Sequence, residues 1–119
     1  MEVRSLGSAA PFATADGSTI RSLLDRTNSP VAHQSLAEAT LAAGRATERH
    51  YHRSLEELYY VVAGQGLMEI DGQTRTVGPG DAILIPPGAW HQLHADKGGE
   101  IKILCCCAPP YSHEDTYFV

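Results

Sequence analysis

Residues 44–64 read GRATERHYHRSLEELYYVVAG, and residues 80–91 read GDAILIPPGAWH. The first stretch places His50 and His52 two residues apart in a β-rich setting. Side chains on a strand alternate between its two faces, so the two imidazoles are expected to point to the same side. The pair is therefore a candidate binding site that the rest of the fold has to complete.

Two further side chains can complete that site. Glu57 follows the histidine pair after a short break, and His91 ends the second stretch just after a proline turn. Three neutral imidazoles and one carboxylate suit a first-row divalent metal such as Mn, Fe, Co, Ni or Zn better than Mg or Ca. Four protein ligands on a six-coordinate metal would leave two positions for water or a substrate.

Glycine and proline punctuate the chain every eight to twelve residues, and short β-rich runs lie between them. This rhythm predicts an all-β sandwich or barrel of antiparallel strands. Asp71-Gly72 favours a type I′ turn between strands 67–70 and 73–77. The other strands are predicted at 3–6, 20–25, 31–41, 58–62, 82–85, 90–95 and 100–107.

The two stretches resemble the two characteristic motifs of the cupin superfamily, and the tail at 109–118 resembles the ending of a group of small bacterial single-domain cupins. The matching positions are Gly44, His50, His52, Glu57 and Gly64 in the first motif, and Gly80, Pro86, Gly88 and His91 in the second. Glu56 competes for the carboxylate position, and the spacing to Gly64 favours Glu57. The chain departs from the family at Ala95, where an asparagine that is not a metal ligand is usual.

The resemblance implies a jelly-roll barrel over residues 20–108, preceded by a lead-in at 1–19. It also implies one divalent metal held by the four ligands and a small-molecule substrate. Family activities include isomerases, cyclases, lyases and dioxygenases, so we expect an enzyme that acts on a small oxygen-rich molecule. The alternative is a non-catalytic cupin that binds or senses a small ligand around a structural metal. Residues 109–119 are either disordered or pack on or near the barrel.

Some residues outside the metal set are candidates for the pocket. Glu38 and Tyr59 are possible catalytic groups, since each can face inward on its predicted strand, although Glu38 can equally face outward and Tyr59 can be a core aromatic residue. Cys105 and Cys107 are expected inside as small hydrophobic residues or as pocket lining.

Composition limits the partners. The 119 residues are 43% hydrophobic and carry a formal net charge of −5 without a basic run, which does not favour nucleic acid. No apolar segment approaches the length of a membrane span, and the N-terminus does not read as a secretory signal. Three consecutive cysteines suit a reducing compartment, so a cytoplasmic location is expected. Cupins commonly pair through sheet edges and faces, and this chain has many short strands whose edges can be open. We therefore predict a homodimer.

Overall fold

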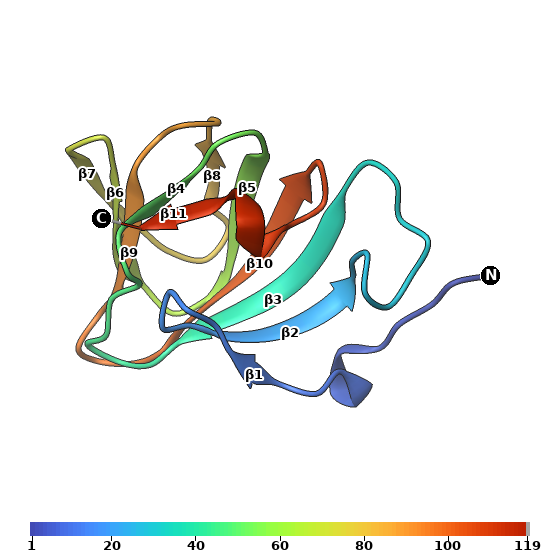
Figure 1. Cartoon of the computed structure of the whole chain (residues 1–119). Helices are drawn as coiled ribbons and strands as arrows, with labels where there is room; N and C mark the ends of the chain where they lie inside the picture. Colours follow the sequence, from blue (N-terminus) through green and yellow to red (C-terminus); the bar gives the residue numbers. More distant parts are fainter. Residues whose placement is uncertain (119) are drawn as a thin grey trace.

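The structure is a computed structural model, and it describes residues 1–118. Two antiparallel sheets face each other as a jelly-roll sandwich, which confirms the predicted all-β class (Figure 1). The first sheet runs in the order β1 (Phe12–Ala13), β2 (Thr19–Leu24), β3 (Ser35–Leu41), β10 (Ile101–Ala108), β5 (Glu56–Ala63) and β8 (Ala82–Ile85). The second runs β11 (Thr116–Phe118), β4 (His50–His52), β9 (His91–Ala95), β6 (Gly66–Ile70) and β7 (Gln73–Val77).

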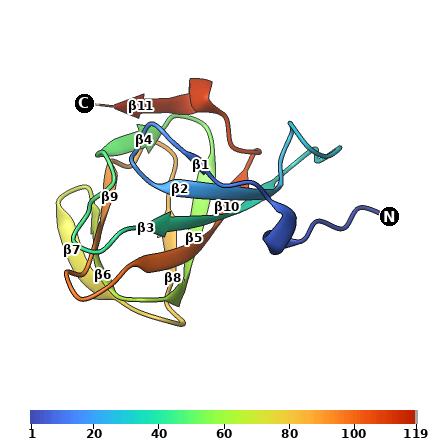
Figure 2. The ribbon, with the colours of Figure 1, turned by 90° about the horizontal axis from the view of Figure 1, so that it is seen from below.

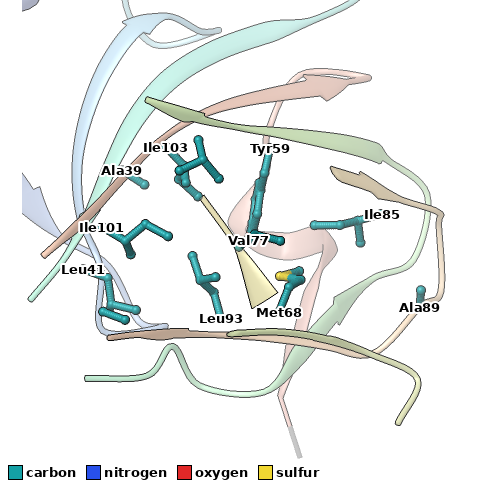
Figure 3. Close-up of a cluster of buried hydrophobic side chains, with 12 residues drawn as sticks. Ala39, Leu41, Tyr59, Met68, Val77, Ile85, Ala89, Leu93, Ile101 and Ile103 are labelled. Carbon is teal, nitrogen blue, oxygen red and sulfur yellow. The ribbon is translucent and has the colours of Figure 1, made fainter. Parts of the chain in front are cut away.

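The core lies between the sheets, where alternate residues of the strands point inward (Figure 3). Strand β5 shows the pattern most clearly, because Tyr59 and Val61 are buried while Leu58, Tyr60 and Val62 are exposed. The buried side chains of the other strands, with one from the loop before β9, complete one cluster: Ala39, Leu41, Met68, Val77, Ile85, Ala89, Leu93, Ala95, Ile101 and Ile103. Burial of this apolar surface is the main stabilising contribution to the sandwich.

Turn chemistry fixes the hairpin of β6 and β7. Asp71 has φ 48° and Gly72 has φ 86°, as a type I′ turn requires, and Ile70 lies opposite Gln73. The glycine that closes the first motif has a different reason. Gly64 has φ +81°, and a Cβ there would lie 2.0 Å from the carbonyl oxygen of Glu100, so only glycine fits.

The first and last strands of the described chain belong to different sheets. The predicted strand at 3–6 is wrong, because residues 1–5 have no regular secondary structure, a 3₁₀ turn (η1, Leu6–Ser8) follows them and the first strand is β1. After a second 3₁₀ turn (η2, His113–Asp115), β11 pairs antiparallel with β4, and Tyr117 stacks on Tyr51 at 5.1 Å. The C-terminal segment up to Phe118 thus extends the sheet that carries the histidine pair, while residue 119 lies outside the described residues (Figure 2).

No helix in residues 1–118 has the length and apolar character needed to cross a membrane.

Candidate metal centre

Strand β4 determines the direction in which the side chains of the first two histidines point. His50 and His52 are each 3% exposed and point inward, while Tyr51 between them faces the other way and stacks on Tyr117. Strand alternation therefore produces the arrangement that the sequence pattern predicts. The two rings lie 5.1 Å apart between centroids, nearly perpendicular to each other.

His91 and Glu57 come to the same point from different elements. His91 begins β9 directly opposite His50, and its ring lies 4.2 Å from the His50 ring. Glu57 belongs to β5 in the facing sheet and is 5% exposed, whereas Glu56 is exposed. The cluster therefore joins the two sheets.

The polar atoms converge closely. The three histidines each offer a nitrogen within 4.8 Å of the other two. Glu57 Oε1 lies 3.3 Å from His52 Nε2 and 3.8 Å from His91 Nε2. Such a set of histidines could hold a divalent metal, with the Glu57 carboxylate beside it.

Hydrogen bonds on the outer side of the rings orient the histidines. His50 Nδ1 donates to the carbonyl oxygen of Glu48 at 2.7 Å, and His91 Nδ1 donates to that of Ala89 at 3.0 Å. A carbonyl can only accept, so Nδ1 carries the proton and Nε2 keeps its lone pair. His52 Nδ1 lies 3.2 Å from the hydroxyl of Thr116 on β11. Metal-binding histidines are generally fixed through the second nitrogen in this way.

Burial leaves two atoms of the cluster without partners. Within residues 1–118, Glu57 Oε1 and His91 Nε2 are the buried side-chain nitrogen and oxygen atoms that make no hydrogen bond. Burial is the main cause that lowers the pKa of His91 to about 4, so its imidazole is neutral at neutral pH. A divalent cation would satisfy both atoms, and the neutral imidazole is the form that binds it. The residues therefore fit a metal.

A cavity of about 90 Å³ adjoins the cluster, which is room for several waters or a small molecule. Tyr59 lines it, and burial together with the charge of Glu57 raises the pKa of its phenol well above 10. Cys105 and Cys107 also line it, as expected, and the Cys107 thiol donates to Glu57 Oε2 at 3.3 Å. Burial raises the pKa of Cys107 far above its usual range, so the thiol keeps its proton.

Glu38 does not line this cavity, and of the two orientations that the sequence leaves open it takes the one toward the other face of the sheet, where it is 5% exposed. Its neighbours Ala37 and Ala39 line the cavity, while Glu38 lies opposite Arg21 and Leu104 on the other face of the first sheet. A side chain on that face cannot reach a substrate held at the histidines.

Several cavity residues are not marked by any local sequence pattern. Asp16 lies in the turn before β2, while Tyr111, Thr116 and Phe118 come from the C-terminal segment. Phe118 also lies 5.6 Å from the His50 ring. These positions depend on how distant segments pack, so neither a motif nor a spacing could indicate them.

Comparisons with known proteins agree with this fold. A family model described as "Cupin domain" matches residues 37–107. An uncharacterized protein of Methanocaldococcus jannaschii is 46% identical over 89% of this chain and 85% of its own length. An L-ectoine synthase of Mycobacteroides abscessus is 31% identical over 70% of this chain and 63% of its own length. The structure of the polyketide cyclase RemF from Streptomyces resistomycificus superposes with a TM-score of 0.80 at 26% identity, covering 97% of this chain and 89% of the cyclase.

Proposed function

This chain belongs to the cupin family, and we propose that it is a metal-dependent enzyme acting on a small oxygen-rich molecule. The observation that carries the proposal is the convergence of His50, His52, His91 and Glu57 beside a cavity, with the outer nitrogen of each ring already hydrogen-bonded. Relatives named as a synthase and as a cyclase support catalysis rather than storage.

The four side chains would hold one divalent transition metal, with Mn, Fe, Co, Ni and Zn as the candidates. Bound there, the metal would polarise a substrate oxygen or activate dioxygen. Reactions of the isomerase, cyclase, lyase or dioxygenase type use this chemistry. The choice among them depends on the groups that line the cavity rather than on the fold.

Tyr59 is the proposed hydrogen-bond donor to a substrate oxygen. Its phenol remains protonated at neutral pH, and its ring lies 6.2 Å from that of His91, so a substrate oxygen near the histidines comes within its reach. Cys107 holds Glu57 through one oxygen and leaves Oε1 directed at the histidines. The apolar side chains of Ile20, Leu36 and Ile103 line the cavity and restrict the access of water to a substrate bound there.

A second candidate is a non-catalytic cupin that binds or senses a small ligand around a structural metal. The placement of Glu38 favours it, because this carboxylate is turned away from the cavity. Proton chemistry then rests on fewer groups than the sequence suggests.

Cobalt(II) reconstitution tests the proposal. Untagged protein is stripped of metal, titrated with Co²⁺ and followed by visible absorption, beside His91→Ala and the control His94→Gln on the same strand. We expect one equivalent in the wild type and the control, and none in His91→Ala. Addition of glycolate should then change the spectrum, because coordination positions remain open.

The same samples separate the two candidate functions. In D₂O, proton NMR of hydroxy-carbonyl compounds should show exchange or turnover with the wild type and little with Tyr59→Phe. A spectrum that responds to no oxygen ligand, with no turnover, would select the structural-metal alternative. Equal cobalt binding by His91→Ala would refute the ligand set.

The homodimer is a further part of the proposal. Four large apolar residues on the outer face of the first sheet are 45–54% exposed, namely Leu58, Tyr60, Val62 and Leu84. They lie together on β5 and β8, where Leu58 is directly opposite Leu84, and a second copy would cover them about a two-fold axis. Light scattering should show a dimer that Tyr60→Glu disrupts and that Leu67→Glu, on the other sheet, preserves. A wild-type monomer at micromolar concentration would remove this claim.

The cytoplasmic location stays a proposal. It is supported by the three free thiols of Cys105, Cys106 and Cys107, which suit a reducing compartment.

A further inference from the structure

The turn between β1 and β2 holds a carboxylate in a fixed position. Thr14 and Ser18 close the turn, with the Thr14 N–H donating to the Ser18 carbonyl at 3.0 Å, and Gly17 takes the left-handed φ of 93°. Asp16 Oδ1 accepts three hydrogen bonds, from the Thr14 hydroxyl at 2.5 Å, the Ser18 hydroxyl at 2.6 Å and the Ser18 N–H at 2.9 Å. Within residues 1–118, Oδ2 takes no hydrogen bond, so it is free to accept one.

This turn is attached to the segment that leads into the histidine pair. The Asp16 carbonyl accepts the Glu48 N–H at 2.7 Å, and the Glu48 carbonyl in turn accepts His50 Nδ1. Figures 1 and 2 both show the turn beside the start of β4. Two successive hydrogen bonds thus link the Asp16 backbone to the His50 ring, and Asp16 lines the same cavity.

The carboxylate is charged, and its charge acts on the inside of the cavity. Burial raises the pKa of Asp16, but the hydrogen bonds from Ser18 and Thr14 outweigh it and the net pKa is lowered. The pKa of Tyr111, on the C-terminal side of the cavity, is raised mainly by burial and further by the Asp16 charge. The cavity thus has a hydrogen-bond acceptor that the metal centre does not use.

We propose that Asp16 is a specificity-determining residue, whose Oδ2 accepts a hydrogen bond from a hydroxyl or ammonium group on the substrate. This inference rests on the proposed function, in which an oxygen-rich end of the same molecule lies at the histidines and Glu57. A substrate with an apolar far end would cover Oδ2 of this half-buried carboxylate and leave that oxygen with neither water nor a donor, which costs binding energy. The substrate class is therefore a small molecule with a chelating oxygen group at one end and a donor at the other.

Binding of matched probes to the zinc-loaded protein tests this directly. Calorimetry compares plain carboxylates of three to six carbons with the ω-hydroxy and ω-amino acids of the same lengths. At the best length, the wild type should bind the donor-bearing acid about tenfold more tightly than the plain acid, as a charge-assisted hydrogen bond provides. The hydroxy and amino series show which donor is preferred.

Asp16→Asn should reduce that preference to within about twofold for the ammonium series. The asparagine side chain keeps one oxygen that can accept the hydrogen bonds from Thr14 and Ser18. Asp16→Ser is a second variant that removes the negative charge. Asp81→Asn is the control, because Asp81 also accepts a turn N–H, from Gly78, but does not line the cavity.

The outcomes separate this inference from the proposed function. Zinc uptake and plain-carboxylate binding by the wild type without a donor preference would overturn the role of Asp16 alone. A donor preference that survives in both Asp16 variants would do the same. Failure to take up zinc, or to bind any carboxylate, would overturn the proposed function and this inference with it.

Discussion

Replacing Asp115 by alanine should loosen the C-terminal segment and, through it, the metal centre. The Asp115 carboxylate accepts the N–H of Ser54 at 3.0 Å and that of Leu55 at 3.0 Å, across the turn that joins β4 to β5. That turn connects His52 to Glu57. Asp115 therefore links β11 to two of the proposed ligands.

The size of the effect follows from the two bonds. Ser54 is exposed, so water replaces its lost acceptor at little cost, whereas the Leu55 bond is partly buried. Leaving a buried donor without a charged acceptor costs about 2 kcal/mol. For a domain of this length, that corresponds to a decrease in melting temperature of about 8 °C, at about 4 °C for each kcal/mol.

Thermal unfolding of the metal-free protein measures this change. Asp115→Asn keeps one acceptor oxygen and should lose about half as much, while Glu114→Ala, at the exposed neighbouring position, should melt with the wild type. Zinc affinity should fall by about tenfold in Asp115→Ala, because Thr116 then holds His52 less firmly. If Asp115→Ala melts within 2 °C of the wild type, the reasoning about this segment is wrong.

Two further predictions concern the glycines and the thiols. Gly64→Ala should cost more than about 3 kcal/mol in urea unfolding, because its Cβ would meet the Glu100 backbone, whereas Gly72→Ala, with open space around it, should cost about 1 kcal/mol from its positive φ alone. Equal losses would contradict the close-approach argument. With Ellman's reagent, at most one thiol should react in the native protein, that of Cys106, and three in denaturant, because Cys107 is 3% exposed and burial raises the pKa of Cys105 well above its usual range. Rapid reaction of two or more thiols in the native protein would show that the cavity is open.

Local rules account for the parts of the site that the sequence indicates. His50 and His52 share a face because strand alternation is a short-range property, and the Asp71-Gly72 turn follows from its own two residues. The same rule places Glu38 on the face of β3 opposite to that of Ala37 and Ala39, which line the cavity, although Glu38 itself is only 5% exposed there.

Long-range packing accounts for what the sequence does not indicate. Asp16 reaches the cavity because its turn binds Glu48, and Thr116 reaches His52 because β11 pairs with β4. Neither contact has a signature in the spacing of residues. The prediction of a strand at 3–6 is wrong for a related reason. A short segment near a terminus forms a strand only where the edge of another strand is close enough to pair with it.

Elemental analysis tests the central claim most directly. The protein, purified without a histidine tag, is compared with a His50→Ala/His91→Ala double variant whose fold is checked by circular dichroism. The account predicts close to one equivalent of Mn, Fe, Co, Ni or Zn in the wild type and none in the folded variant. Absence of metal from the wild type even after reconstitution, or equal metal in both proteins, would contradict it.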